Sequence, residues 1–195
     1  MDSGLRQALA RYDLDSLGRS GDVVYVIDAD LRLRFVNQRY EQVADAVTGG
    51  EVLETYPLGS CVVDGIDAVL RHHYTDLFEA TLQTGEPRMA DYHCHTPEEE
   101  RTFRCMIYPL GTEGLLTVHG ELESRPWPKA DVEAVRDPDT GLVSMCAGCR
   151  RVRMDEGGWR HVPQFIDEAP RDTTHGLCDP CLGFYLGATA RGAQR

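Results

Sequence analysis

The sequence has no long apolar run and no apolar leader. No hydrophobic stretch approaches the roughly 20 residues that a membrane-crossing helix needs. The N-terminal segment MDSGLRQALARYDLDSLGRS lacks the uncharged core of a secretory signal. Basic residues are also few, 20 Lys and Arg against 32 Asp and Glu. We therefore expect a cytoplasmic protein with reduced thiols, no membrane association and little affinity for nucleic acid.

The negative charge is unevenly distributed along the 195 residues. From Leu142 onward seven arginines accompany six acidic residues, whereas 13 basic and 26 acidic residues precede it. The tail arginines Arg150, Arg151, Arg153 and Arg160 are the one candidate for an anion-binding patch, although a solvated arginine face explains them more simply. Hydrophobic residues make up 42% of the whole chain, an ordinary share that predicts a folded protein.

Periodicity predicts an α+β domain with an antiparallel sheet. A β-hairpin is expected where Val24 and Val26 alternate on one arm, Leu33 and Phe35 alternate on the other, and an acidic turn joins them. The other expected elements are an amphipathic helix over 2–17, short helical turns over 38–53, a long helix over 66–84 and strands over 88–95, 101–110 and 114–122.

The segment VIDADLRLRFVNQRY and the order of these elements resemble a PAS domain. The resemblance covers about 100 residues and implies a sensory or interaction module. It implies a five-stranded antiparallel sheet that forms a pocket beneath helices, often in a homodimer, and it specifies no ligand.

Four of the seven cysteines form two CxxC pairs in the tail, Cys146 with Cys149 and Cys178 with Cys181. Zn²⁺ accepts four thiolates at tetrahedral positions, and two CxxC turns can supply them. The 28 intervening residues exceed common zinc-ribbon spacings of about 15–20, but they predict a hairpin over 150–162 and a short helix over 163–169. Trp159, Val162, Phe165 and Ile166 are expected to form a small core, too small to fold without a metal.

The tail is also similar to a short module, CxxC followed by HGxCxxC, that comes after PAS and receiver domains in many bacterial signalling proteins. That resemblance implies a structural zinc site with Cys146, Cys149, Cys178 and Cys181 as ligands. His175 is either an alternative ligand or a neighbour that packs beside the site. Four closed ligands leave no position for water, so a catalytic zinc is not expected.

Other cofactors and chemistries compete with this interpretation. His73 or His72 on the long helix could bind haem in an oxygen- or redox-sensing domain. His93 and His95 share a strand face and could bind a metal, although a solvated face is the simpler prediction. A thiol oxidoreductase would need a reactive cysteine at a helix N-terminus, and a hairpin rather than a helix is expected after Cys146. Oxidation of the zinc thiolates could also act as a redox switch.

The sequence therefore predicts a non-enzymatic sensor and adaptor with a protein partner. The expected divisions are an N-terminal helix (1–19), a PAS-like domain (20–123), a linker (124–141), a zinc module (142–186) and a flexible tail (187–195). The alternatives are a zinc-containing transcription regulator, which would need a recognition helix after the CxxC, and a haem- or redox-sensing PAS protein.

Overall fold

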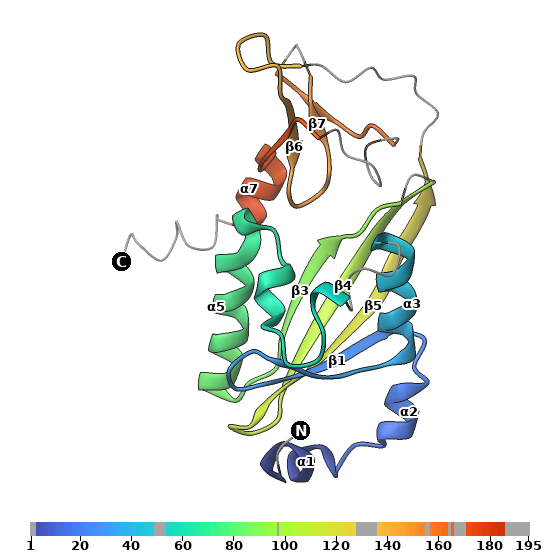
Figure 1. Cartoon of the computed structure of the whole chain (residues 1–195), viewed down its shortest axis with the longest axis vertical. Coiled ribbons are helices and arrows are strands. Elements are labelled where there is room, and N and C mark those ends of the chain that lie inside the picture. The colour runs from blue at the N-terminus through green and yellow to red at the C-terminus, as the bar shows by residue number, and fades with distance from the viewer. Residues whose placement is uncertain are drawn as a thin grey trace. The chain divides into compact units, whose positions relative to one another are not determined.

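The computed structural model describes residues 3–48, 54–96, 98–127, 136–154, 157–163, 165 and 171–185. The chain divides into two compact units. The first comprises 1–66, 74–91 and 103–121, and the second comprises 67–73, 92–102 and 122–195. The elements (Figure 1) are α1 (Ser3–Leu9), α2 (Leu14–Gly18), β1 (Val23–Asp28), β2 (Leu33–Val36), α3 (Gln38–Thr48), the 3₁₀ helix η1 (Val62–Gly65), α5 (Ala68–Thr84), β3 (Arg88–His93), β4 (Glu99–Pro109), β5 (Gly114–Pro126), β6 (Val143–Cys146), β7 (Val152–Arg153), β8 (Trp159–Arg160), β9 (Thr173–Gly176) and α7 (Asp179–Tyr185).

A five-stranded antiparallel sheet in the order β2-β1-β5-β4-β3 confirms the predicted α+β fold. Strand β1 lies between β2 and β5 and pairs antiparallel with both. The predicted hairpin is therefore present, but β1 does not alternate between buried and exposed residues. Val24 to Asp28 are all buried, because a central strand is covered on both of its faces.

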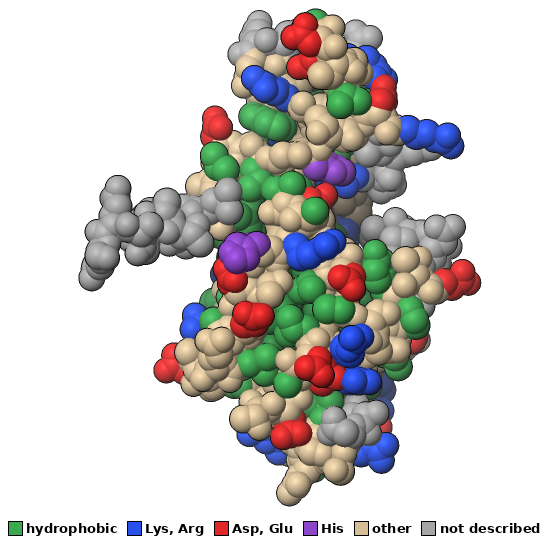
Figure 2. All heavy atoms as spheres, turned by 60° about the vertical axis from the view of Figure 1, so that its left-hand side comes forward, with side chains coloured by type: hydrophobic (Ala, Val, Ile, Leu, Met, Phe, Trp, Pro, Cys, Tyr) green, Lys and Arg blue, Asp and Glu red, His purple; other side chains and the backbone are tan. Residues whose placement is uncertain are grey.

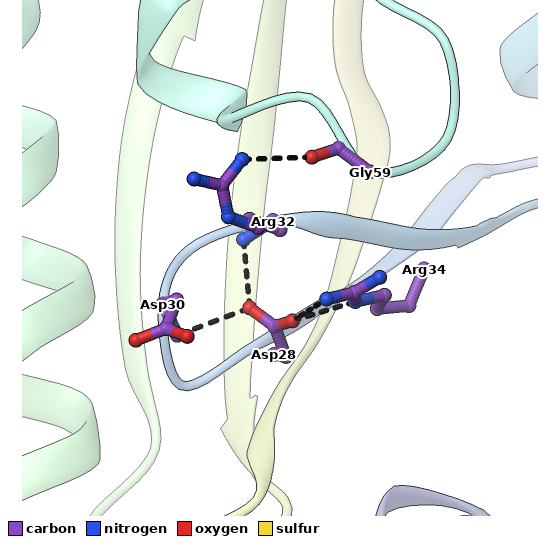
Figure 3. Close-up of polar contacts among 5 residues, drawn as sticks. All are labelled: Asp28, Asp30, Arg32, Arg34 and Gly59. Carbon is purple, nitrogen blue, oxygen red and sulfur yellow. Dashed lines mark hydrogen bonds and ion pairs between the residues drawn. The ribbon is translucent and has the colours of Figure 1, made fainter. Parts of the chain in front are cut away.

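The acidic turn of the hairpin is held by Asp28 (Figure 3). One carboxylate oxygen, Oδ1, accepts the backbone N–H groups of Asp30 and Arg32 at 3.0 and 2.9 Å. The other, Oδ2, pairs with the Arg34 guanidinium at 2.5 Å. Arg32 in turn donates to the carbonyl of Gly59 at 3.0 Å. One buried carboxylate thus closes the turn and fixes where β2 begins.

The N-terminal segment contains two short helices where the sequence predicts one. α1 ends at Leu9, and α2 begins after Asp13, whose side chain accepts the backbone N–H groups of Asp15 and Ser16 at 3.1 Å. An N-cap residue has an extended backbone, so a single helix cannot continue through Asp13, and the break has a local cause.

One face of the sheet packs against α1. Leu5 and Leu9 of this helix form a fully buried cluster with Val24, Val26, Leu110 and Leu116. On the other face of β1, the Tyr25 ring lies 5.9 Å from the Tyr40 ring of α3. Because alternate residues of a strand point to opposite faces, the sheet has two cores.

Helix α5 confirms the predicted long helix, and its end at Gly85 (φ +66°) follows the expected glycine stop. Leu70, Phe78 and Thr81 of this helix are buried, whereas Val69 is 38% exposed. The face that α5 buries therefore runs through Leu70, Phe78 and Thr81.

In the tail a four-stranded sheet has the order β8-β7-β6-β9. β7 and β8 form the predicted hairpin, with Met154 and Gly158 joined by a backbone hydrogen bond of 2.8 Å. β9 pairs parallel with β6. The expected helix over 163–169 and the expected tail over 187–195 fall mainly or wholly outside the described residues.

Strand β5 continues to Pro126, inside the segment expected to be a linker. Next to it, the indole N–H of Trp127 donates to the carbonyl of Thr96 at 2.7 Å.

Within the described ranges, no helix has the length and apolar character required to cross a bilayer.

Candidate functional site

The four tail cysteines come together in the second unit. Cys146, Cys149, Cys178 and Cys181 are all buried, and their Sγ atoms lie within 4.8 Å of one another. The Sγ atoms of Cys149 and Cys178 are 3.5 Å apart. The backbone N–H of Cys178 donates to the Cys146 sulfur at 3.4 Å. The two halves of the motif therefore face one common point.

The first cysteine pair lies on a tight turn at the end of β6. The carbonyl of Cys146 accepts the N–H of Arg150 at 2.9 Å. The N–H of Cys146 donates to the carbonyl of Arg151 at 2.7 Å. Arg150 adopts a left-handed conformation (φ +60°), which reverses the chain after Cys149. Gly148 lies so close to the second pair that a Cβ atom there would be 3.1 Å from the Cys181 sulfur. The tight turn of the backbone therefore points both sulfurs of the first pair toward the second pair.

The second pair begins a helix that the sequence analysis did not predict. Cys178 directly precedes α7, and Cys181 lies in its first turn. The carbonyl of Cys178 accepts the N–H of Leu182 at 2.7 Å. The Asp-Pro after Cys178 is a typical helix start and was the available signal.

Four thiols in contact cannot all ionise without a cation. Hydrogen bonds from Cys149 and Cys181 lower the pKa of the Cys146 thiol. The same contact with Cys146 raises the pKa of Cys149 and of Cys181. A thiolate is therefore favoured at one position and opposed at its neighbours, and a divalent cation would stabilise all of them together.

Arg151 adds positive charge beside this group. Burial opposes its charged form, but Cys149 and a hydrogen bond to Cys178 outweigh burial and raise the pKa of the guanidinium. A zinc ion with four thiolates would carry a net charge of −2, and a half-buried guanidinium partly offsets such a charge.

The cysteine group fits a zinc ion by chemistry and by size. Thiolates are preferred zinc ligands, and a tetrahedron with Zn–S bonds of about 2.3 Å has S–S edges of about 3.8 Å. The Cys149 and Cys178 sulfurs are 3.5 Å apart, close to that edge, and all four sulfurs lie within 4.8 Å of one another. These four residues would hold the metal, which would link β6, the turn after it and α7.

His175 lies outside this group of four. It is exposed in β9, and its Nδ1 is 3.3 Å from a carboxylate oxygen of Asp67. Its neighbour Gly176 accepts the N–H of Ala147 at 2.8 Å, so β9 reaches the cysteine turn through its backbone.

The core beside the cysteines is small. It contains Val143, Met145, Val152 and Val162, with Phe165 packed against them. Trp159, expected in this core, is half-buried and does not belong to the cluster, and Ile166 lies outside the described residues.

The two histidines of the β3 end do not form a solvated face. His95 is only 8% exposed, and its ring stacks on His93 with centroids 5.1 Å apart. The ring centroids of Trp127 and His161 lie 5.0 and 4.8 Å from the His95 ring centroid, both edge-on. Burial lowers the pKa of His95 to about 3 and that of His161 to about 4, so both rings are neutral at pH 7. The prediction of a solvated face was wrong because it omitted residues that come from far along the chain.

The haem candidates on α5 differ in environment. His72 is exposed. His73 is half-buried within the second unit, and its ring lies edge-on to Tyr185 of α7 at 5.1 Å.

Comparison with solved structures finds several matches at low identity, some of them PAS domains. A crystal structure of the phage VqmA–DPO complex is 15% identical with a TM-score of 0.45, and the match covers 61% of this chain and 55% of that one. The PAS domain of a Colwellia psychrerythraea protein is 13% identical with a TM-score of 0.43, covering 56% and 92%. The PAS domain of Bordetella pertussis BvgS is 20% identical with a TM-score of 0.39, covering 56% and 82%. The chain thus spans about half the length of the VqmA structure.

No curated protein matches the chain. The family model described as PAS fold matches residues 17–123, which is more than half of the chain. That stretch contains the hairpin closed by Asp28, helix α5 and the five-stranded sheet. The chain therefore belongs to the PAS family.

Proposed function

We propose that the chain is a non-enzymatic signalling adaptor, in which a PAS sensor (20–123) is coupled to a zinc-stabilised module (142–186) that contacts a partner protein. The observation that supports it most is the burial of four cysteine thiols around one point in a member of the PAS family. PAS domains provide sensing and protein contacts, and the metal would give a small module a defined surface.

A protein partner is favoured over nucleic acid by the charge of the chain, −12 overall. Figure 2 shows acidic side chains interspersed with basic ones on the face it presents. PAS domains commonly mediate protein interactions and dimerisation, so we also propose that the PAS domain forms a homodimer.

The first experiment is metal analysis of the full chain after dialysis against a mild chelator, together with a visible spectrum. We expect one zinc per chain, absent from the Cys178→Ser/Cys181→Ser variant, and no Soret band. Thiol titration should show the four tail cysteines protected until a strong chelator is added. A metal-free protein whose tail thiols cycle with a disulfide would replace the adaptor with a thiol oxidoreductase. A Soret band that His73→Ala abolishes would make it a haem sensor.

The second experiment tests the partner. Crosslinking in the source cells should give one reproducible partner with the wild-type chain and none with Cys178→Ser/Cys181→Ser. His175→Ala, which leaves the four cysteines intact, is the matched control. Specific DNA retention that persists at physiological salt would favour the transcription regulator instead.

A further inference from the structure

A second group of metal-type ligands lies in the second unit, apart from the four cysteines. It consists of His95 after β3, Glu100 in β4 and His161 after β8. One donor atom from each lies within 4.8 Å of the others. His95 is buried, and the other two side chains are partly buried.

His161 already has the arrangement of a metal-binding imidazole. Its Nε2 lies 3.0 Å from the carbonyl of Cys149, so Nε2 carries the proton and donates it. Nδ1 is then unprotonated. A histidine that binds a metal through one ring nitrogen commonly donates the N–H of the other to a carbonyl in this way.

Glu100 keeps one carboxylate oxygen available. The Arg125 guanidinium binds Oε2 at 2.6 Å, which leaves Oε1 outside this ion pair. The Glu100 side chain is only 15% exposed. An anion fixed in this way within 4.8 Å of two imidazole nitrogens is a suitable ligand for a divalent cation.

His95 supplies the buried polar atom that still needs a partner. Its Nδ1 accepts the N–H of Arg101 at 3.0 Å, whereas its buried Nε2 has no hydrogen-bond partner in the described part of the chain. To bind a metal, the ring must move its proton to Nδ1 or turn over. Either change gives up the bond to Arg101, so affinity should be lower than at four thiolates.

We propose that His95, Glu100 and His161 bind a divalent transition-metal ion at a site separate from the cysteine group. Two imidazoles and one carboxylate suit zinc, cobalt or nickel, whereas magnesium and calcium prefer oxygen ligands alone. Three ligands leave one coordination position for water or for His93. The ring of His93 stacks on His95, and its Nδ1 is likewise buried without a hydrogen-bond partner among the described residues.

The test uses the full chain with zinc in the cysteine group and no excess metal. Co²⁺ is then titrated and followed by calorimetry and by visible absorption. We expect one further equivalent, with the weak bands of cobalt bound by nitrogen and oxygen and without thiolate-to-cobalt charge transfer. Glu100→Gln and His95→Ala should each weaken this binding at least about tenfold. Glu98→Gln, an exposed neighbour with the same charge change, should leave it unchanged.

Absence of a further equivalent in the wild-type chain would overturn the proposal and make the cluster a hydrogen-bonded group. Equal cobalt binding in wild type, Glu100→Gln and His95→Ala would overturn it too. Zinc in the cysteine group is measured in every variant, so a failure of this site is distinguishable from a failure of the proposed zinc module.

Discussion

At the scale of single residues, Asn37 connects the sheet to α3. It is 2% exposed, and its Oδ1 accepts the N–H groups of Val24 and Tyr40 at 3.0 and 2.9 Å. Its Nδ2 donates to the carbonyl of Asp22 at 2.8 Å. One amide therefore caps a helix and pairs two backbone groups of the strand region beside it.

Asn37→Ala should lower the free energy of unfolding by on the order of 3 kcal/mol, because buried backbone groups lose their partners. Gln38→Ala, which removes an exposed amide from the next position, should change it by less than about 0.5 kcal/mol. Urea denaturation of both variants measures the difference. Equal stabilities would show that water replaces the asparagine.

His119 should make the stability of the protein depend on pH. Burial lowers its pKa to about 4 from an ordinary value near 6.5. Between these values the unfolded chain binds a proton that the folded chain does not, so stability falls as pH decreases from 6.5 to 4. The His119 contribution should be on the order of 3 kcal/mol, since each unit of pKa shift corresponds to about 1.4 kcal/mol. Denaturation of wild type and His119→Gln across this range measures it, and parallel pH curves for the two proteins would contradict the assignment.

Residue roles set by local chemistry could be predicted from the sequence. The acidic turn at Asp28 and the bond by which Asn37 caps α3 at Tyr40 depend on neighbours within a few positions. The bonds of Asn37 to Val24 and Asp22 connect more distant positions and do not follow from local sequence. The burial of His95 could not be predicted, because Trp127 and His161 cover it and a strand pattern carries no information on distant partners. For the same reason the sequence offered His95 as a weak metal candidate and did not find Glu100 or His161.

At the scale of elements, the strands and α5 follow from periodicity, while short helices depend on caps. The strands lie where the alternating pattern predicts them, and β4 and β5 are longer than predicted. The break between α1 and α2 and the start of α7 depend on Asp13 and on an Asp-Pro pair. Capping residues are weak signals within segments that already favour helix, so these boundaries were missed.

The turn of the first CxxC pair gives a prediction at this scale. A Cβ atom on Gly148 would lie 2.7 Å from the Tyr185 ring and 3.1 Å from the Cys181 sulfur. Gly148→Ala should therefore displace α7 and increase the rate of zinc loss to a chromogenic chelator about tenfold or more. Gly158→Ala is the matched control, since nothing lies within 4 Å of its Cβ position. Similar zinc release from both variants would mean that the turn tolerates the methyl group.

At the scale of the whole molecule, the two units should differ in what stabilises them. The first has an apolar cluster that joins α1 to the large sheet. The tail strands of the second have four buried apolar residues and Phe165, and two of those strands are only two residues long. A core this small does not offset the entropy of ordering the tail, so metal binding should supply the missing free energy.

Metal removal should therefore unfold the tail and leave the PAS sheet folded. Both tryptophans, Trp127 and Trp159, lie in the second unit, so tryptophan emission reports on that unit alone. A strong chelator should shift the emission to longer wavelength, while the thermal transition followed by far-ultraviolet circular dichroism persists. Added zinc should restore the emission, except in Cys178→Ser/Cys181→Ser. An unchanged emission after the metal is measurably gone would show that the tail folds by packing alone. A simultaneous loss of all secondary structure would show instead that the two units depend on one another for stability.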